Sequence, residues 1–391
     1  MKHPPFLLPR NSVLPDFQGG GLFGLARDLR AWLHAPEAVP LPFVDAPPTG
    51  PLVLVVIDGL GDVFLQRHGA GSTLLQHRLR HLTSVFPSTT ASAVTTLQTG
   101  LSPVQHGLTG WHIHDRRFGG VVTPLPLRRR GSGALRAPFL AQRLFPYAAM
   151  YGDCRLPVAV VAPADIAFSA FSRRHGRGAV LNAFSRPDGF VPAIVDALAQ
   201  NGSAPQFLHA YYSRFDAVCH RFGAHSDQAI AEFHRVDRLF ARLLDQLAGQ
   251  EVTVLLTADH GFVDAPERKH LRLAYLPELS RMLASPLFGE RRVAFCRVRK
   301  GAGDDFLALA TARLRGRAVV QPSQRLIEAG MFGPGKPSLQ LSSHCGTHAL
   351  LMEPGWTISD RMVGEKDHRM RGVHGGLSGD EMWVPLIVAR P

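Results

Sequence analysis

Short continuous runs of apolar, largely β-branched residues recur along the chain. The clearest run covers residues 52–57; it follows Pro51 and ends at Asp58-Gly59. A run of this kind, bounded by proline and glycine, is typical of a strand that is buried on both faces, as in a parallel sheet. Similar runs predict further strands at residues 158–161, 206–212, 252–257 and 382–389.

Helical patterns separate these predicted strands. Apolar residues recur at helical spacing in residues 24–34, 190–200 and 227–247. Strands that alternate with helices favour βαβ units, in which a parallel sheet is covered by helices on both faces. The fold class expected from the pattern is therefore α/β, with a mostly parallel central sheet.

The stretch from 265 to 345 has a different pattern. Residues 292–298 alternate as in an exposed strand, 304–314 favour a helix, 318–321 favour another strand, and 330–337 are rich in Gly and Pro. We interpret this stretch as an inserted α+β lid rather than as an independent domain. The catalytic core is then predicted to comprise residues 1–264 and 346–391.

Carboxylate and imidazole groups follow several of the predicted strands. Asp58 ends the first, Asp216 follows the strand at 206–212, and Asp259-His260 follow the strand at 252–257. In open α/β sheets, ligands bind beyond the carboxyl ends of the strands. Each Asp alone is more often a turn or helix-cap residue, but together the four groups indicate a metal cluster.

Two further histidines extend this cluster. His220 is four residues after Asp216, so on a helix both side chains point to one face and can share a metal ion; a surface ion pair is the alternative. His374 precedes Gly375-Gly376, and a histidine beside glycines can approach a metal without obstruction from neighbouring side chains. By itself it would be interpreted as a loop residue.

The hydroxyl-rich segment 84–100 contains a candidate nucleophile. Pro87 and the hydroxyls of Ser88, Thr89 and Thr90 suit a helix start, and Gly100 suits its end. The N-terminus of a helix favours an anion, and a metal-bound threonine alkoxide there would attack phosphorus. A capping cluster without chemistry is the alternative.

In order and spacing, these motifs resemble the alkaline phosphatase superfamily, and within it the nucleotide pyrophosphatase/phosphodiesterase branch. The resemblance extends from about residue 50 to the end of the chain. The motifs that carry it are Ile57-Asp58-Gly59, Phe86-Pro87-Ser-Thr-Thr90, Thr99-Gly100-Leu-Ser-Pro103-Val-Gln-His106-Gly107, Asp216 to Gly223, Ala258-Asp259-His260-Gly261 and His374-Gly375. The fold implied is a three-layer αβα sandwich with an inserted lid.

The resemblance also assigns roles to individual residues. It makes Thr90 the nucleophile of a covalent phosphothreonine mechanism. One zinc ion would be held by Asp216, His220 and His374. The other would be held by Asp58, Asp259 and His260, with Thr90 touching it. The implied reaction is hydrolysis of a phosphodiester or pyrophosphate bond, and the alternatives within the superfamily are phosphomonoester and phosphonate hydrolysis. A mutase role is disfavoured because the Phe-Pro-threonine segment resembles the diesterase branch.

The sequence departs from the branch pattern at one important position. Relatives carry an asparagine after the His-Gly pair that binds a phosphate oxygen, whereas an ungapped count places Trp111 there. An indole N–H can donate a hydrogen bond, but its bulk would reshape the pocket. Trp111 and the adjacent His112 are therefore candidate substrate-binding residues. The segment that sulfatases convert to formylglycine is absent around Pro87, which disfavours a sulfatase.

The charge balance is basic. The chain has 43 Lys and Arg against 31 Asp and Glu, a formal net charge of +12. This favours anionic substrates or partners, although genome base composition produces the same arginine bias. A non-catalytic protein that binds nucleic acid or anionic lipid is the remote alternative. We expect a small-molecule phosphate ester as the partner, and not nucleic acid.

The remaining features concern the compartment. The four cysteines show no CxxC pairing, no apolar run approaches the ~18 residues of a membrane span, and the proline-rich residues 1–17 lack the apolar stretch of a signal peptide. The cytoplasm is the compartment expected from these observations.

Overall fold

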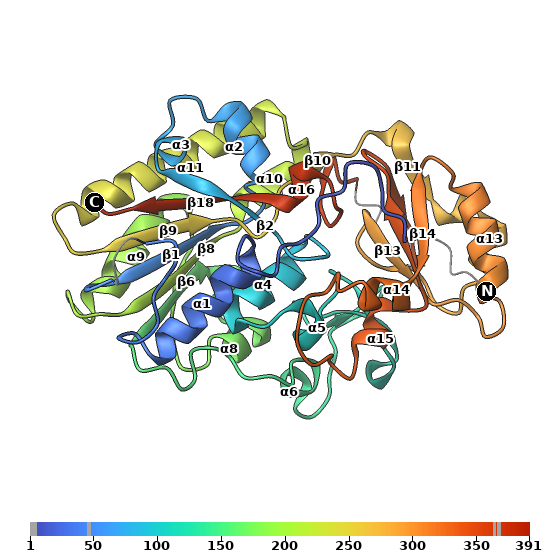
Figure 1. The fold of residues 1–391 in the computed structure, drawn as a ribbon, viewed down its shortest axis with the longest axis horizontal. Helices are drawn as coiled ribbons and strands as arrows, with labels where there is room; N and C mark the ends of the chain where they lie inside the picture. The colour runs from blue at the N-terminus through green and yellow to red at the C-terminus, as the bar shows by residue number, and fades with distance from the viewer. Residues whose placement is uncertain (1–5, 45–47, 363–364, 366–368) are drawn as a thin grey trace.

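A seven-stranded sheet forms the centre of the protein (Figure 1). The computed structural model describes residues 6–44, 48–362, 365 and 369–391, so the first five residues of the N-terminal segment considered above lie outside the described residues. From one edge to the other, the strands are β2 (Arg78–Thr83), β18 (Trp383–Ala389), β9 (Thr253–Thr257), β1 (Leu52–Ile57), β8 (Phe207–Tyr212), β6 (Val158–Pro163) and β7 (Val180–Phe184).

The sheet is mostly parallel, as predicted. β1 pairs in parallel with β8 and β9, and β6 pairs in parallel with β7 and β8. β18 runs antiparallel to both of its neighbours, β2 and β9. Every residue of β1 is buried, which is why its sequence is a continuous apolar run rather than an alternating one.

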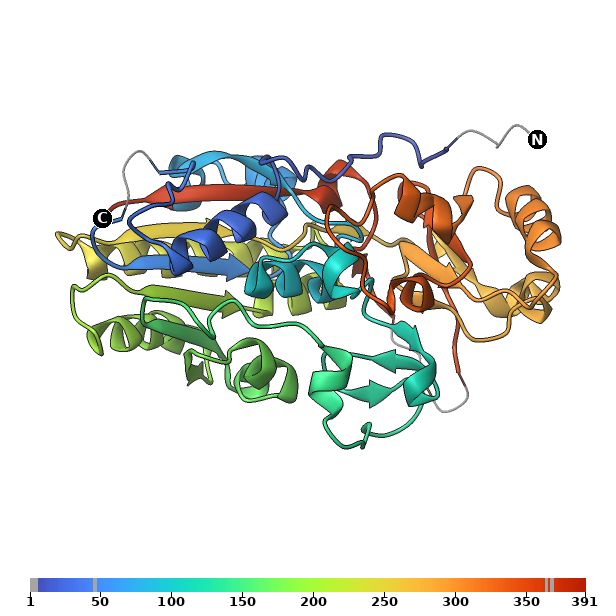
Figure 2. The ribbon, with the colours of Figure 1, turned by 60° about the horizontal axis from the view of Figure 1, so that its bottom comes forward.

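Helices cover both faces of the sheet, which confirms the expected three-layer arrangement (Figures 1 and 2). One face carries α1 (Leu22–His34), α4 (Thr90–Thr99) and α8 (Ala170–His175). The other carries α2 (Asp62–His68), α9 (Phe190–Ala199) and α11 (Asp227–Leu247). The buried side of α11 follows helical spacing through Phe233, Val236, Phe240 and Leu243.

The predicted strands and long helices of the core are confirmed, with ends that differ by one or two residues. The pattern did not predict β2 and β7, the two edge strands. β2 reads Arg-Leu-Arg-His-Leu-Thr and β7 is half exposed, so neither carries the apolar run of a central strand. The side chains of an edge strand are less buried than those of a central strand, so its sequence does not need to be a continuous apolar run.

A second, smaller sheet lies beyond the carboxyl ends of the parallel strands (Figure 2). Its strand order is β12 (Phe288–Gly289), β13 (Val293–Cys296), β15 (His348–Met352) and β14 (Ala318–Pro322), all antiparallel, with α13 (Gly303–Arg313) beside it. The strands and helix predicted within residues 265–345 are present, and β15 joins them from just beyond residue 345. The expectation of an exposed strand at residues 292–298 is wrong, because β13 is an inner strand with both faces packed in hydrophobic clusters. The division into a core and a lid subdomain stays a prediction.

The other elements are short. Three small strand groups are β3 (Ile113–Asp115), β4 (Gly120–Thr123) and β5 (Arg128–Arg129); β10 (Val263–Asp264) with β17 (Gly372–Val373); and β11 (His270–Arg272) with β16 (Thr357–Ser359). The remaining α-helices are α3 (Thr73–Gln76), α5 (Pro103–His106), α6 (Leu140–Leu144), α7 (Ala164–Ala167), α10 (Arg214–Phe222), α12 (Pro277–Arg281), α14 (Ser323–Glu328), α15 (Leu341–Cys345) and α16 (Gly379–Met382). None of the helices in the described part of the chain has the length and apolarity needed to cross a membrane.

A buried ion pair connects the smaller sheet to the last part of the chain. Arg292, just before β13, donates from Nε and Nη2 to the two carboxylate oxygens of Glu381 in α16, at 3.0 and 2.9 Å. Both side chains are almost fully buried. Glu381 also accepts from the backbone N–H of Gly376 (2.8 Å). The pair therefore fixes the segment that carries His374.

Candidate active site

Two adjacent parallel strands deliver the most buried polar residues of the site. Asp58 follows β1, and Asp259 and His260 follow its neighbour β9. The Asp259 carboxylate accepts from the backbone N–H groups of Gly59 (3.0 Å) and His260 (3.1 Å). Because the two strands are locked in register, these strand ends bring the three side chains together without a flexible loop.

Asp58, Asp259 and His260 form a cluster that we call the buried triad. His260 Nε2 lies 3.5 Å from Asp58 Oδ1 and 3.5 Å from Asp259 Oδ2. The Tyr211 hydroxyl, from β8, donates to the other oxygen of Asp58. One donor atom from each member lies within 4.8 Å of the others, a grouping that can hold a metal ion.

A second cluster, the half-buried triad, comprises Asp216, His220 and His374. Asp216 and His220 occupy one face of α10 four residues apart, with His220 Nε2 3.3 Å from Asp216 Oδ1. His374 comes from the loop between β17 and α16, with Nε2 3.8 Å from the same oxygen. Gly375 permits this approach: it has φ +105°, and a Cβ there would lie 2.7 Å from the side chain of Glu290.

The three imidazoles are oriented by backbone carbonyls. His220 Nδ1 lies 2.9 Å from the carbonyl oxygen of Gly372. His260 Nδ1 lies 3.1 Å from that of Gly261, and His374 Nδ1 lies 3.3 Å from that of Ser88. A carbonyl only accepts, so Nδ1 carries the proton and Nε2 is left with its lone pair towards the triads. This is the arrangement that metal-binding histidines adopt.

The electrostatics of both triads favour a bound cation. Asp58 Oδ1, Asp216 Oδ1 and Asp259 Oδ2 are buried and have no hydrogen-bond partner among the described residues. Burial and the neighbouring carboxylates raise the pKa of Asp58 well above its usual range; burial also raises that of Asp216. Burial, reinforced by His260 and His220, lowers the pKa of His374. A cation would remove these penalties, and carboxylates with neutral imidazoles are ligands that zinc accepts.

Thr90 lies beside the buried triad. It is the first residue of α4, its hydroxyl is 3.1 Å from His260 Nε2, and it lines a large cavity. The predicted helix start and its end at Gly100 are both observed. The structure thus brings together all seven residues expected at the metal cluster; their roles as ligands and nucleophile stay predictions.

The two residues predicted to contact substrate also line this cavity. Trp111 is 40% exposed, and its backbone N–H donates to Glu290 (2.6 Å). His112 Nδ1 is 3.1 Å from the Thr123 hydroxyl, and burial lowers the pKa of His112 to about 3. His112 is therefore neutral at neutral pH.

Two residues of the site were not predicted from the sequence. Glu290 is buried between Thr89, whose hydroxyl donates to it (2.5 Å), and the backbone of Trp111; burial raises its pKa to about 7. No local pattern identifies it, because it reaches the site from the smaller sheet. Tyr211 could have been found, because it pairs with Val56 and two-residue periodicity therefore places it on the same face of the sheet as Asp58.

A cavity of about 980 Å³ opens at these residues. Its wall includes Thr90, Asp58, Asp216 and His374 from the triads and the start of α4, and Phe288, Glu290 and Ile358 from the smaller sheet and its surroundings. The site therefore lies where the carboxyl ends of the parallel strands meet the smaller sheet, as expected for an open α/β sheet.

Comparison with known proteins matches this arrangement to one family and to several solved structures. The model of the family described as type I phosphodiesterase / nucleotide pyrophosphatase matches residues 52–377. Murine ectonucleotide pyrophosphatase/phosphodiesterase 5 is similar in structure with a TM-score of 0.62 and 16% identity, over 87% of this chain and 88% of that one. Another structure of the murine protein contains AMP.

Phosphonoacetate hydrolase from Sinorhizobium meliloti 1021, in complex with phosphonoformate, gives a TM-score of 0.63 at 20% identity, over 87% of this chain and 90% of that one. Among curated proteins, alkaline phosphatase PhoD of Zymomonas mobilis is 36% identical over 74 residues, which are 18% of this chain and 13% of that protein. So short a match carries no argument about activity.

Proposed function

Because the chain belongs to the type I phosphodiesterase / nucleotide pyrophosphatase family, we propose that it hydrolyses a phosphodiester or pyrophosphate bond in a small phosphate ester. Thr90 would act as the nucleophile, with two divalent cations, most suitably zinc, at the two triads. The observation that carries the proposal is the pair of triads at the same cavity as a threonine hydroxyl, each with a buried carboxylate oxygen that has no hydrogen-bond partner among the described residues.

The buried triad would hold one cation and the half-buried triad the other. Bound cations would supply positive charge to the phosphoryl oxygens and favour deprotonation of the attacking hydroxyl and water. The buried triad offers two carboxylates and one imidazole, and the half-buried triad offers one carboxylate and two imidazoles. At neither triad does the negative charge of the ligands exceed the positive charge of a dipositive ion.

In the first step, the Thr90 oxygen attacks phosphorus and the bond to the leaving oxygen breaks. The hydroxyl is well placed for this step, since it lies at the N-terminus of α4, where the helix dipole stabilises an anionic phosphoryl group. The product alcohol or phosphate leaves with a proton. Water then attacks the phosphothreonine, releases the phosphate product and restores the hydroxyl.

Glu290 would act as a positioning residue in this scheme. It accepts from the Thr89 hydroxyl and from the Trp111 backbone, so it connects the residue before the nucleophile to the cavity wall. The same contacts keep Trp111 at the rim, where we expect its ring to shape the space for the ester substituent.

The test is a metal-loading and substrate experiment on the whole chain. The protein is stripped with a chelator, reloaded with zinc, and assayed with bis(4-nitrophenyl) phosphate, 4-nitrophenyl phosphate and phosphonoacetate, while bound zinc is measured by elemental analysis. We expect two zinc ions per chain and a preference for the diester. Freshly purified, active protein without metal would refute the proposal.

The same assay separates the alternatives within the superfamily. A preference for the monoester would make the protein a phosphomonoesterase, and release of phosphate from phosphonoacetate would make it a phosphonate hydrolase. We also propose the cytoplasm as its compartment: all four cysteines are unpaired, as a reducing environment favours.

A further inference from the structure

Residues 113–145, which comprise β3, β4, β5 and α6, carry an unbalanced positive charge. This segment, which we call the arginine module, contains seven arginines, no lysine and one acidic residue, Asp115. In Figure 2 its three strands and α6 project at the bottom of the molecule. A large part of the positive charge of the chain is therefore concentrated in one projecting part of the fold.

Most of this charge has no carboxylate partner. Asp115 pairs with Arg117 at 2.6 Å, and Arg130 pairs with Glu365 at 2.9 Å. The other arginines of the module are exposed and form no ion pair among the described residues: Arg116, Arg128, Arg129, Arg136 and Arg143. Because unpaired like charges at a surface repel one another and attract anions, the module favours an anionic partner.

Contacts with Phe118 hold three of the guanidinium groups close together. Arg129 Nη2 donates to the backbone carbonyl oxygen of Phe118 (3.0 Å). The guanidinium carbons of Arg143 and Arg117 lie 5.0 and 5.5 Å from the centre of the Phe118 ring, within the range of cation–π contacts. Three cations therefore surround one phenylalanine, and among the described residues only Arg117 has a carboxylate partner as well.

An exposed aromatic ring lies at the start of α6. Phe139 is 75% exposed, and Pro138 before it is exposed as well. The backbone of Phe139 is left-handed, with φ 53°, which is unfavourable for a bulky side chain. The ring is thus held in water by a strained backbone and contributes little to the core. A strained residue that exposes a large apolar group is typical of a binding surface.

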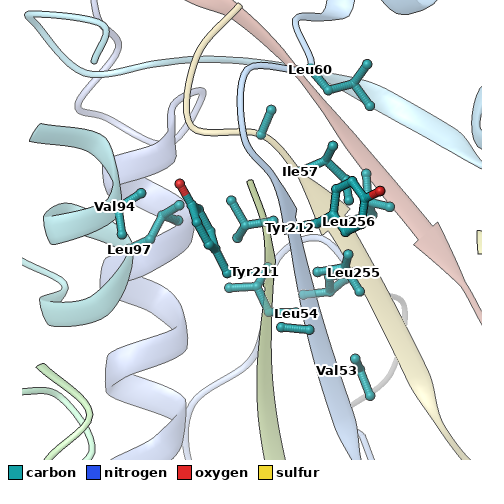
Figure 3. Packing of buried hydrophobic residues seen from close by; sticks show 14 of the residues in the cluster. Val53, Leu54, Ile57, Leu60, Val94, Leu97, Tyr211, Tyr212, Leu255 and Leu256 are labelled. Atoms are coloured by element: carbon teal, nitrogen blue, oxygen red, sulfur yellow. The ribbon is translucent and has the colours of Figure 1, made fainter. Parts of the chain in front are cut away.

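The inner side of the module is anchored in the core of the protein. Ile113, Phe118 and Val122 belong to the same buried cluster as the side chains that Figure 3 shows between α4 and the central strands. On another side, Leu125 and Arg130 line the cavity at the candidate active site. The module is therefore a fixed part of the fold, and a partner bound to its outer face lies next to the cavity.

The composition of the module favours a lipid surface over a nucleic acid. Nucleic-acid sites that tolerate many sequences use several aromatic rings on which bases stack, whereas Phe139 is the only exposed aromatic side chain of the module. Residues 134–139 instead combine Ala, Leu and Pro with this Phe and a single Arg. An apolar tip flanked by arginines is typical of segments that bind at the interface of anionic membranes.

We propose that the outer face of the arginine module is a docking surface for a membrane that contains anionic lipids. The Phe139 ring inserts among the headgroups, and the arginines without carboxylate partners lie against the lipid phosphates. The cytoplasmic leaflet of a membrane carries such lipids, in agreement with the compartment proposed above. The inference goes beyond the proposed function and does not depend on it, because membrane binding requires no turnover.

The test measures binding of the whole chain to extruded vesicles by co-sedimentation. The vesicles contain phosphatidylcholine alone or phosphatidylcholine with about 30% phosphatidylglycerol, at ~0.1 M NaCl. We expect binding to the anionic vesicles to be at least about tenfold tighter than to the neutral ones, since arginines near an anionic surface each add to the affinity. Raising the salt to ~0.5 M should reverse most of this binding, because exposed charges are then screened.

A triple variant tests the arginines. Arg116→Gln, Arg128→Gln and Arg136→Gln together remove three side chains that form no hydrogen bond or ion pair among the described residues. Binding to anionic vesicles should weaken by about a hundredfold, since each arginine contributes roughly fivefold. The matched control combines Arg238→Gln, Arg242→Gln and Arg315→Gln, which remove the same charge from exposed positions on α11 and beyond α13. The control should bind almost as wild type does.

A second variant tests the aromatic tip. Phe139→Ser should weaken binding to anionic vesicles by about tenfold, because it removes the apolar group that enters the interface. Tyr275→Ser is its control, because this ring is also 75% exposed but lies outside the module; it should leave binding unchanged. Circular dichroism and thermal unfolding of every variant check that the fold is retained.

Three results would overturn the inference. The first is the absence of binding to anionic vesicles at ~0.1 M NaCl. The second is an equal loss of binding in the module variants and in their controls, which would show that net charge alone acts. The third is tighter binding to single- or double-stranded DNA than to the vesicles, measured by fluorescence anisotropy in the same buffer, which would make the module a nucleic-acid surface.

Discussion

The two triads hold similar groups but are built in different ways. The buried triad comes from the ends of two neighbouring strands in the middle of the sheet, and all three residues are at most 4% exposed. The half-buried triad joins one helical turn of α10 to a loop that arrives from a distant part of the chain. Asp216 and His220 remain partly exposed, and only His374 is buried.

The buried triad is thus positioned by the strands of the central sheet, whereas the half-buried triad depends on side-chain and loop contacts. Strand register fixes Asp58 and Asp259 at little further cost, because the backbone around them is already hydrogen-bonded in the sheet. His374 instead depends on Gly375 and on the ion pair of Arg292 with Glu381, which holds the following segment through Gly376. The second arrangement is easier to disturb by changes far from the site.

The largest expected effect is on the residue beside the buried triad. Thr90→Ala should lower kcat by at least about a thousandfold, because it removes the nucleophile of the proposed reaction, while both triads keep their metal. Thr95→Val, which removes another buried hydroxyl from the same helix, should keep most of the activity. Steady-state kinetics with elemental analysis of both variants test this. Undiminished turnover in Thr90→Ala would indicate that Thr89 or Ser88 is the nucleophile instead.

The next effect concerns the anchor of the half-buried triad. Glu381→Gln breaks a buried charge pair and should lower the free energy of unfolding by ~3–5 kcal/mol. It should also release metal from the half-buried triad before the buried one. Glu267→Gln, which breaks an exposed pair with Arg272, should change the free energy by less than ~1 kcal/mol. Urea unfolding and metal titration measure both; equal losses from the two triads would contradict the comparison.

The ion pair of Arg292 with Glu381 should also make the stability of the protein depend on pH. Burial alone would raise the pKa of Glu381, but Arg292 together with hydrogen bonds from Ser378 and Gly376 holds it below the usual value of 4.5. A lowered pKa in the folded state contributes stability above the unfolded-state pKa, and this contribution is lost as the pH falls through the folded value. Stability of the wild type should therefore fall more steeply below pH 4.5 than that of Glu381→Gln, measured by thermal unfolding across that range.

Paired substitutions of one carboxylate in each triad compare the triads directly. Asp259→Asn alters a group that accepts two backbone N–H bonds, so we expect loss of one metal and ~1–3 kcal/mol of stability in the metal-free protein. Asp216→Asn should also lose one metal but leave the metal-free protein within ~1 kcal/mol of wild type, because its Oδ1 has no hydrogen-bond partner among the described residues. Equal destabilisation would show that both triads are equally part of the core.

The smallest effect is expected at the rim. Trp111→Phe keeps an aromatic wall and should change kcat by less than about threefold, whereas Trp111→Ala should raise KM and broaden substrate choice, because tryptophan contributes mainly contact area. A loss of ~10² in kcat for the phenylalanine variant is what removal of a phosphate-oxygen donor would produce, and it would assign that role to the indole N–H. Kinetics on one diester decide between these outcomes.

The sequence predicted the parts of the site that strand ends and local motifs place. Asp58, Asp259 and His260 follow apolar runs, and Asp216 with His220 has helical spacing, so their positions follow from the chain pattern. Glu290 could not be predicted, because it reaches Thr89 from the smaller sheet and no local sequence pattern indicates that these two parts of the chain meet. The strands β2 and β7 were not predicted either. They lie at the edges of the central sheet, where many side chains are exposed and the sequence is not restricted to apolar residues.

The position of β18 between β9 and β2 also has a consequence for biosynthesis. A ribosome releases β2 and β9 long before β18, so during translation β2 has no neighbour in the sheet and one side of β9 has no partner. The same late segment follows His374. An emerging chain would therefore complete its sheet and its second triad in the same step, and under the proposed function it would gain activity only at that point.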